Sequence, residues 1–337
     1  MPLLEVKDLH TSFFTDAGEV KAVNGVSFTL DRHKVLGIVG ESGSGKSVTA
    51  YSIMQILANT GKIVSGSIKL DGQELVGAGE RVMKTVRGNK ISIIFQDPMT
   101  SLNPTYTIGH QLMEAIVLHT NRNKKQAYDR AVEMLRLVNI NEPEKRMQQY
   151  PHEFSGGMRQ RIMIAMALAC EPDILIADEP TTALDVTIQA QILELMKSLQ
   201  QELGMAIIMI THDLGVVAQL CDEVIVMYAG SICEQGTADE IFYNPCHEYT
   251  KGLMRSIPTA DTAGTKLQPI TGTPIDLLNM PKGCPFAPRC DAAMRICLKE
   301  RCERILINDD HAAACWMNVK KGVEDGTMAV EGGDSNE

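Results

Sequence analysis

Residues 40–47 read Gly40-Glu41-Ser42-Gly43-Ser44-Gly45-Lys46-Ser47 and match the pattern G-x-x-x-x-G-K-[ST]. The apolar run Val35–Val39 precedes them, and apolar residues at helical spacing follow Lys46. In such a loop, glycines let the chain turn tightly, so that backbone N–H groups and the start of a helix face phosphate groups. We therefore predict a nucleotide site in which Lys46 contacts the β- and γ-phosphates and Ser47 contacts Mg²⁺. The residues expected to surround the phosphates are Gly40, Ser42, Gly43, Ser44, Gly45, Lys46, Ser47 and Val48.

The rest of the sequence is typical of a folded chain that does not enter the bilayer. Its 337 residues, 44% hydrophobic and 22% charged, are enough for about two domains. No apolar run approaches the roughly 18 residues of a membrane-spanning helix, and Met1–His10 lacks the pattern of a secretory signal. The net charge of −10 argues against binding to duplex nucleic acid, which depends on Lys and Arg. These features predict a cytosolic protein that binds no nucleic acid.

Strand-like and helical stretches alternate on both sides of the nucleotide motif. Apolar runs at 174–177, 206–210 and 224–227 are separated by helical patterns such as 187–201, which is typical of βαβ units and a parallel sheet. Two further patterns are strand-like alternation at 3–9 and 20–30 and helical periodicity throughout 108–139. We predict an α/β fold with an antiparallel β portion and a helical insert.

Acidic residues end one of the predicted parallel strands. Asp178 and Glu179 directly follow the apolar residues 174–177. Beside a phosphate-binding loop, a strand-end acid of this kind helps to hold the metal ion. We expect Asp178 to support Mg²⁺ from just outside its direct ligands. Glu179 points differently, because side chains alternate along a strand, and it could polarise an attacking water.

A second candidate phosphate site lies at Ser155-Gly156-Gly157, just before a helix expected over 159–170. The positive end of a helix dipole and its free N–H groups suit a phosphate group. One nucleotide already has a complete cradle at 40–47. The second site is therefore expected to serve a nucleotide held by another subunit.

These motifs occur in the order found in ABC-type ATPases, which the chain resembles from residue 3 to about 257. The motifs are residues 40–47, Gln96 after Ile93-Ile94-Phe95, Ser155-Gly156-Gly157, Asp178-Glu179, Ala183-Leu184-Asp185 and His212. The segments Pro245–Thr250, 253–258 and Gly283–Cys290 are similar to those of the oligopeptide/dipeptide importer ATPases, and specifically to their D-type subunit. The resemblance covers nearly the whole chain.

The resemblance implies a P-loop ABC ATPase domain with a RecA-like core, an antiparallel β subdomain and a helical subdomain. It further implies that Phe13, or else Phe14, stacks on adenine and that Gln96 reaches Mg²⁺. In the same way, Glu179 is expected to act as general base and His212 to hold the γ-phosphate and the attacking water. The residues expected at a head-to-tail dimer interface are Ser155, Gly156, Gly157 and Asp185.

By the same resemblance, the chain is expected to hydrolyse ATP and drive uptake of di- and oligopeptides. The implied partners are a second ATPase chain of the F type, two membrane permease subunits and, indirectly, an extracytoplasmic peptide-binding protein. The chain would then lie at the cytoplasmic face of the cell membrane. Two alternatives stay open at this point. One is a soluble ABC ATPase that acts on nucleic acid or ribosomes, and the other is an importer ATPase for nickel or another small solute.

Five of the nine cysteines lie within Cys284–Cys315. In a reducing compartment, thiolates grouped in this way most often bind a metal or a cluster, and their spacing does not decide between Zn²⁺ and [4Fe–4S]. The family resemblance implies a [4Fe–4S] cluster on Cys284, Cys290, Cys297 and Cys315, with Cys302 spare or as a substitute ligand.

The predicted organisation is an ATPase domain at 1–257, a linker and Cys-rich module at 258–321 and a disordered acidic tail at 322–337.

Overall fold

The computed structural model describes residues 1–96, 101–182, 184–256 and 269–324. Its main sheet has the strand order β11-β12-β10-β9-β3-β8-β7-β6. The five strands from β6 to β9 run parallel, and β10, β12 and β11 continue the sheet antiparallel. The strand bounds are β3 Val35–Val39, β6 Ile91–Ile94, β7 Ile174–Asp178, β8 Ala206–Thr211, β9 Glu223–Tyr228, β10 Ser231–Thr237, β11 Ile305–Asn308 and β12 His311–Ala313. The predicted parallel α/β sheet is confirmed.

The central strands are continuous apolar runs because both faces of the main sheet are covered. Every residue of β3, β7 and β8 is buried. Along β3, Leu36 and Ile38 pack in one hydrophobic cluster, whereas Val35 and Val39 pack in the other. This alternation follows from the two-residue period of a strand. The molecule therefore has two hydrophobic cores, one on each face of the same sheet.

One face packs against a second, antiparallel sheet of order β2-β1-β4-β5, with α1 between the layers. The bounds are β1 Leu4–Thr15, β2 Gly18–Leu30, β4 Gly61–Leu70, β5 Gln73–Glu74 and α1 Lys46–Met54. The sequence predicted this antiparallel portion from alternation at 3–9 and 20–30. A short helix, α2 (Glu80–Val86), then leads into β6.

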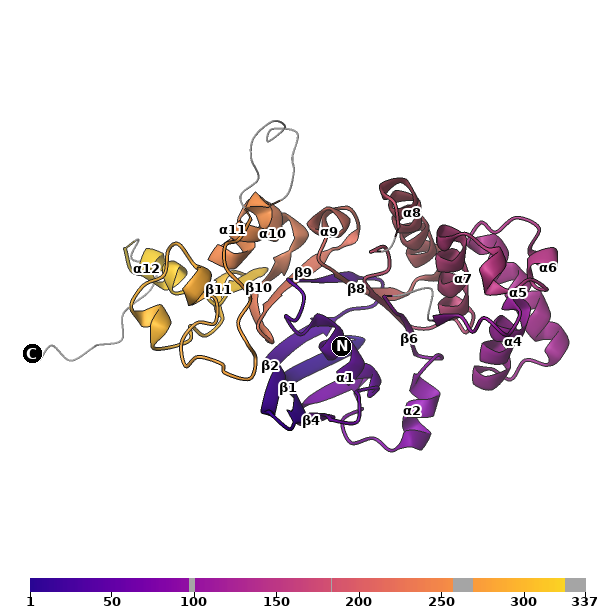
Figure 1. Cartoon of the computed structure of the whole chain (residues 1–337), viewed down its shortest axis with the longest axis horizontal. Helices are drawn as coiled ribbons and strands as arrows, with labels where there is room; N and C mark the ends of the chain where they lie inside the picture. Colours follow the sequence, from indigo (N-terminus) through magenta and orange to yellow (C-terminus); the bar gives the residue numbers. More distant parts are fainter. Residues whose placement is uncertain (97–100, 183, 257–268, 325–337) are drawn as a thin grey trace, which may run out of the picture.

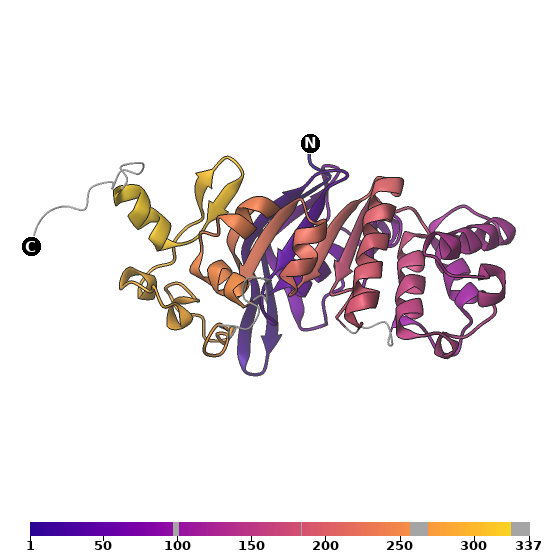
Figure 2. The ribbon, with the colours of Figure 1, turned by 90° about the horizontal axis from the view of Figure 1, so that it is seen from above.

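The other face is covered by helices, and a helical unit lies at one end of the molecule (Figure 1, Figure 2). The helix bounds are α4 Ile108–His119, α5 Lys124–Leu137, α6 Pro143–Arg146, α7 Gly156–Leu168, α8 Val186–Leu203, α9 Leu214–Leu220, α10 Ala238–Tyr243 and α11 Glu248–Arg255. The helical insert predicted over 108–139 contains two helices, α4 and α5, because Asn123 starts α5 with a capping box. Similarly, α7 begins at Gly156 and not at Arg159, because the Ser155 hydroxyl accepts from the Met158 N–H and caps the helix there.

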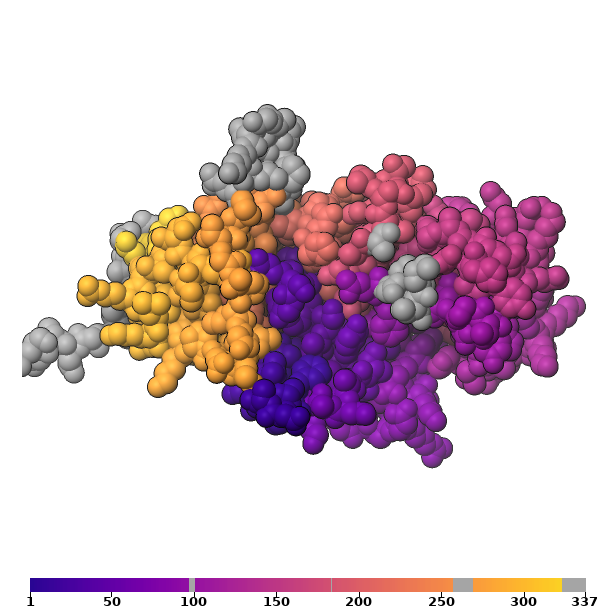
Figure 3. Space-filling view, in the orientation of Figure 1, coloured from indigo at the N-terminus to yellow at the C-terminus, as the bar shows by residue number. Residues whose placement is uncertain are grey.

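Residues 269–324 lie at the opposite end from the helical unit (Figure 1, Figure 2). They contribute β11, β12 and α12 (Trp316–Glu324), and β12 pairs with β10 through Glu234 and Ala313. Phe286 is buried in the same core as the ATPase helices. The Cys-rich module thus shares its sheet and its core with the ATPase portion, and the two form one continuous surface (Figure 3).

Several sequence predictions fall on the ends of the described ranges. The predicted linker falls largely on 257–268, which lie outside the described residues, as does Ala183. The predicted tail starts at Gly322, but α12 continues to Glu324, and 325–337 lie outside the description. The domain boundaries stay a prediction. Within the described residues, no helix combines the length and the apolar character that crossing a membrane requires.

Candidate nucleotide-binding site and cysteine cluster

The loop of residues 40–47 joins β3 to α1 and lies beside the end of β9. Two of its glycines let the loop backbone come close to neighbouring backbone. Gly40 has φ 151°, and a Cβ there would lie 2.2 Å from the Met227 carbonyl oxygen. Gly45 has φ 101°, and its Cβ would lie 2.5 Å from the Ala22 carbonyl oxygen. Any side chain at either position would clash with backbone, so only glycine permits this loop.

Two side chains inside the loop are buried and polar. Lys46 Nζ donates to the carbonyl oxygens of Gly40 (2.7 Å) and Glu41 (2.9 Å). Burial lowers the pKa of Lys46, and the nearby carboxylates of Glu179 and others oppose this shift. The Ser44 hydroxyl is buried and lacks a hydrogen-bond partner within the described part of the chain. A buried orphan hydroxyl beside a desolvated ammonium suits a ligand rich in acceptor oxygens, such as a phosphate chain.

The structure brings Ser47 and Asp178 together, as the sequence predicted. Ser47 Oγ donates to Asp178 Oδ1 at 2.9 Å, and Tyr51 Oη donates to Asp178 Oδ2 at 3.0 Å. Burial raises the pKa of Asp178, while these two hydrogen bonds lower it in part. Burial likewise raises the pKa of Tyr51 to about 12, so its hydroxyl stays a donor. Sequence reasoning missed Tyr51, although its place four residues after Ser47 puts both on one face of α1.

Glu179 lies at the centre of the other predicted catalytic group. Its Oε2 accepts from Gln96 Nε2 and from Thr182 Oγ1, each at 2.9 Å, and its Oε1 lies 3.3 Å from His212 Nδ1. Its backbone has φ 48°, a left-handed conformation that glutamate rarely adopts and that is often retained at functional sites. Three of the predicted catalytic residues, Glu179, Gln96 and His212, are therefore in contact. Thr182 was missed, although it lies three residues after Glu179.

The dimer-interface candidates lie on the helices that flank this group. Ser155 caps α7, and Asp185 caps α8 by accepting from the Ile188 N–H at 2.9 Å. Ser155 and Asp185 are both exposed. The two helices pack closely at Gly157, where an added Cβ would lie only 2.8 Å from the Ile188 side chain. Close packing of α7 on α8 thus fixes Ser155, Gly156 and Gly157 on the surface. Their role toward a second subunit stays a prediction.

The adenine-stacking candidates lie at the end of β1. Phe13 is half-buried over Gly61, where a Cβ would lie 2.8 Å from the ring. Phe14 points to the other side of the strand, is exposed, and has Lys62 Nζ 6.0 Å from its ring centroid. The stacking of adenine on Phe13, with Phe14 as the alternative, stays a prediction.

The clustered cysteines are half-buried free thiols. Burial raises the pKa of Cys284, Cys290 and Cys315, to about 11 for Cys290. Backbone N–H groups face these three sulfurs and lower their pKa, namely Phe286 and Ala287 at Cys284, Ala292 at Cys290, and Met317 and Glu248 at Cys315. Hydrogen bonds of this kind stabilise the thiolate form that binds metal.

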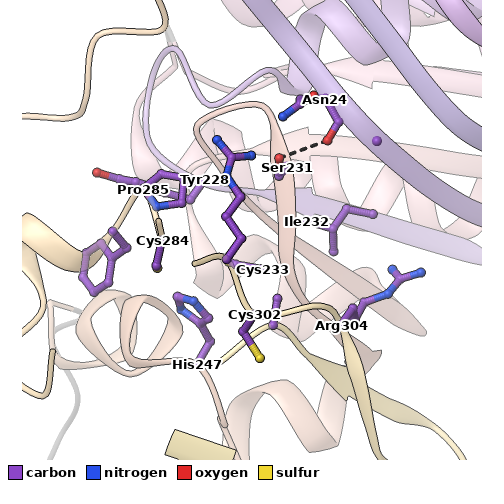
Figure 4. Close-up of a pocket in the computed structure, with 14 residues that line it drawn as sticks. Asn24, Tyr228, Ser231, Ile232, Cys233, His247, Cys284, Pro285, Cys302 and Arg304 are labelled. Carbon is purple, nitrogen blue, oxygen red and sulfur yellow. Dashed lines mark hydrogen bonds between the residues drawn. The ribbon is translucent and has the colours of Figure 1, made fainter. Parts of the chain in front are cut away.

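Cys302 has a different environment from these three cysteines. Burial raises its pKa to about 12, and its Sγ donates to the Glu303 carbonyl oxygen at 3.2 Å. With Cys233 and Cys284, it lines a cavity of about 330 Å³ between the module and the β9–β10 hairpin (Figure 4). A thiol that donates to a carbonyl holds its proton. This environment favours Cys302 as the spare cysteine.

The positions of the clustered sulfurs can be compared with those in a zinc site and in an iron–sulfur cluster. In the described residues, the group of three ligand atoms within 4.8 Å of one another is Glu234, Cys246 and His311, so no three of the clustered sulfurs come that close. Around one zinc ion, thiolates lie only ~3.8 Å apart, since Zn–S bonds are about 2.3 Å. Thiolates on separate irons of a cluster lie farther apart. The [4Fe–4S] cluster on Cys284, Cys290, Cys297 and Cys315 stays a prediction, with Zn²⁺ as the alternative.

The group of Glu234, Cys246 and His311 is itself satisfied by hydrogen bonds. Glu234 Oε1 accepts from His311 Nε2 (2.7 Å) and from the Cys246 N–H (2.6 Å), and Oε2 accepts from the His247 N–H (2.9 Å). Because Glu234 is on β10 and His311 on β12, the network ties the module to the ATPase sheet. We read it as a structural network and not as a metal site.

Most of the chain matches ATP-binding proteins of one transporter family. Residues 23–182 match the family described as ABC transporter, and 233–297 match the oligopeptide/dipeptide transporter C-terminal region. The chain is 52% identical over 336 residues to the dipeptide transport ATP-binding protein DppD of Bacillus subtilis, with 99% of each chain covered. It is 56% identical over 295 residues to the oligopeptide transport ATP-binding protein OppD of Salmonella typhimurium, with 88% of each covered.

The fold is also that of solved ATP-binding cassettes. A dimeric cassette in a post-hydrolysis state, bound to ADP and Pi, is 25% identical and has a TM-score of 0.63. The match covers 70% of this chain and 98% of the cassette. The predicted fold class and family resemblance are confirmed. The chain belongs to the family of ATP-binding proteins of oligopeptide and dipeptide ABC transporters.

Proposed function

We propose that this chain is the ATP-hydrolysing subunit of an ABC importer for di- and oligopeptides. The observation that carries the proposal is the convergence of Glu179, Gln96 and His212 next to the phosphate loop and Asp178. The names of the relatives, which refer to dipeptide and oligopeptide transport, support this class of cargo over nickel or another small solute. The family membership and the net charge of −10 favour a transporter subunit over an ATPase that acts on nucleic acid or ribosomes.

The phosphate chain is held by Lys46 and by the N–H groups of residues 40–47. A hydroxyl, an amide and a carboxylate form the donor set for Mg²⁺, from Ser47, Gln96 and Asp178, and oxygen donors of this kind suit that ion. Bound there, the ion neutralises charge on the phosphate oxygens. Because Gln96 Nε2 already donates to Glu179, its amide oxygen is the atom left for the metal.

Hydrolysis then needs one proton acceptor. Glu179 takes a proton from the attacking water, the water oxygen bonds to the γ-phosphorus, and the bond to the β–γ bridging oxygen breaks to leave ADP. His212, 3.3 Å from Glu179 Oε1, holds the water and the γ-phosphate in line. Thr182 fixes the Glu179 carboxylate from the other side.

The site is completed by a second subunit in a head-to-tail dimer. The nucleotide of the partner, which we infer to be an F-type chain, faces the exposed residues Ser155, Gly156 and Asp185 and the half-buried Gly157. The dimeric state of the similar cassette supports this arrangement. Closure of the dimer acts on two permease subunits at the cytoplasmic face of the membrane, to which an extracytoplasmic binding protein delivers the peptide.

The cysteine module holds a [4Fe–4S] cluster through Cys284, Cys290, Cys297 and Cys315. The N–H groups that face three of these sulfurs support thiolate ligands at these positions, and the family resemblance is the reason for choosing a cluster over Zn²⁺. Bound there, such a cluster would link a segment with few apolar residues of its own, and Cys302 would remain a thiol.

The test is peptide uptake by the complete importer in proteoliposomes with ATP inside. Wild type should accumulate di- and oligopeptides, and Lys46→Ala should abolish both uptake and ATP turnover. Lys197→Ala, at an exposed position on α8, is the matched control and should transport normally. Uptake of nickel in place of peptide, or co-purification with RNA and not with permeases, would overturn the proposal.

A further inference from the structure

Arg289, in the middle of the cysteine module, reaches the phosphate-binding loop. Its Nη1 donates to Glu41 Oε2 at 2.6 Å, and its Nη2 donates to Glu41 Oε1 at 2.9 Å. The two residues are 248 positions apart in the sequence, and the Arg289 side chain is only 5% exposed. Two parallel charge-assisted bonds in a buried setting are among the strongest and most directional contacts that a guanidinium makes.

Glu41 is the second residue of the loop, and it is held through three different groups. Arg289 binds its carboxylate, the Tyr249 hydroxyl accepts from its N–H at 2.8 Å, and Lys46 Nζ donates to its carbonyl oxygen at 2.9 Å. Tyr249, on α11, is fully buried. Two of these three contacts come from outside the ATPase motifs. The position of the loop is therefore set partly by α11 and by the cysteine module.

An aromatic cluster holds Arg289 in place. The Phe286 ring centroid lies 5.4 Å from that of Tyr228 and 5.3 Å from that of Tyr249, and the Arg289 guanidinium lies 5.8 Å from the Tyr228 ring. Tyr228 and Cys284 also line the cavity between the module and the sheet (Figure 4). Because Phe286 and Arg289 lie between Cys284 and Cys290, whatever fixes those two cysteines also fixes the arginine.

The pair has an electrostatic consequence for nucleotide binding. An unpaired Glu41 carboxylate would place a negative charge next to a triphosphate chain, where like charges repel. Paired with Arg289, the same carboxylate is neutralised and turned toward the module. Removing only Arg289 would leave a half-buried charge uncompensated, whereas removing both charges would not.

We propose that Arg289 is a positioning residue of the nucleotide site, which neutralises Glu41 and holds the phosphate loop in its binding geometry. The cysteine module is thereby part of the ATP-binding apparatus and not an appended domain. This inference rests on the proposed function, because it assumes that residues 40–47 bind ATP.

The experiment measures the dissociation constant of Mg-ATP for the full chain. Arg289→Ala should weaken binding about tenfold, and Arg289→Lys, which cannot form both bonds, should fall between it and wild type. Adding Glu41→Gln to Arg289→Ala should recover most of the affinity, since the unpaired carboxylate is then gone. A merely structural role for Arg289 would not give this rescue. The unfolding midpoint of each variant shows that the chains compared are folded.

The matched control is Arg304→Ala. Arg304 also joins the module to the ATPase portion, through the Ser27 carbonyl oxygen and Gln235 Oε1, but it does not contact residues 40–47. Its loss should leave Mg-ATP affinity unchanged. Wild-type affinity in both Arg289 variants, equal weakening in Arg304→Ala, or no rescue by Glu41→Gln would overturn the inference. Absence of Mg-ATP binding in wild type, as expected for Lys46→Ala, would instead overturn the proposed function.

Discussion

Glu179, the proposed general base, is held in place by three neighbouring side chains. Gln96 and Thr182 donate to one carboxylate oxygen, and His212 lies against the other. The carboxylate is thus fixed before any water arrives, which removes the entropic cost of orienting it during the reaction. The same contacts leave it half-buried beside the phosphate loop, where a base is needed.

Glu179→Gln should lower ATP turnover of the assembled complex by about 10²- to 10⁴-fold, because the amide cannot accept a proton from water. The amide is similar in size and can keep hydrogen bonds, so Mg-ATP should still bind. Steady-state turnover and the nucleotide dissociation constant, measured together, check this prediction. Glu202→Gln, an exposed position on α8, is the control. Unchanged turnover in Glu179→Gln would show that another group is the base.

His311 and Glu234 give the module a pH-dependent link to the ATPase sheet. The hydrogen bond to Glu234 raises the pKa of His311 above 6.5, against the effect of burial. Burial raises the pKa of Glu234, but hydrogen bonds from His311 and from the N–H groups of Cys246 and His247 outweigh it, so the pKa is below 4.5. At mildly acidic pH, His311 is therefore protonated and Glu234 is ionised, so the two carry opposite charges.

The stabilisation from His311 is complete below pH 6.5 and is lost as pH rises through its higher folded pKa. The stabilisation from Glu234 is complete above pH 4.5 and is lost as pH falls through the lower pKa that Glu234 has in the folded protein. We predict that the free energy of unfolding of wild type minus that of His311→Gln is largest between pH 4.5 and 6.5 and decreases above that range. Chemical denaturation across pH measures it, with His110→Gln on α4 as control. A difference that grows above pH 6.5 would contradict the assignment.

At the scale of elements, the start of α7 combines a structural and a proposed functional role. Ser155→Ala should cost about 1 kcal/mol of stability through loss of the N-cap, and it should also lower turnover of the assembled dimer. Asn123→Ala removes the corresponding cap of α5 at a similar cost in stability and should leave turnover unchanged. Chemical denaturation and ATPase assays of the two variants separate the roles. Equal turnover in both would place Ser155 outside the catalytic interface.

The segment from Cys284 to Cys290 is the element that joins the proposed cluster to the core. Protein purified anaerobically should be brown, with broad absorbance near about 400 nm, the region expected for thiolate-ligated iron. Cys290→Ser should lose iron and colour, whereas Cys302→Ser should keep both, because Cys302 holds its proton against the Glu303 carbonyl. Iron and zinc analysis of the three proteins checks this. One zinc per chain and no colour in wild type would rule out the cluster.

At the scale of the whole molecule, the two ends of the sheet have different tasks. The helical unit at one end carries Ser155, and the cysteine module at the other end contacts the loop through Arg289 (Figure 1). The nucleotide loop lies between them, at the carboxyl end of β3. A change in the module can therefore reach the loop through the buried Arg289–Glu41 pair, whereas Ser155 is exposed and is proposed to face the nucleotide of the partner.

The sequence by itself determined the parts of the protein that are made by neighbouring residues. The phosphate loop, the strand ending at Asp178-Glu179 and the parallel sheet were predicted because their signals lie within short segments, where glycine conformation and apolar periodicity act locally. The break before Asn123 and the early start of α7 were missed, because apolar spacing continues across both caps.

Only the tertiary structure decided how distant segments meet. Arg289 and Glu41 form a pair across 248 positions, Tyr51 and Asp178 across 127, and β12 extends the ATPase sheet beside β10. No local pattern encodes these contacts, because each depends on two segments being brought together when apolar surfaces are buried. Five clustered cysteines predicted a metal-binding module from the sequence. The fold alone decided that this module shares the core of the ATPase and touches its phosphate loop.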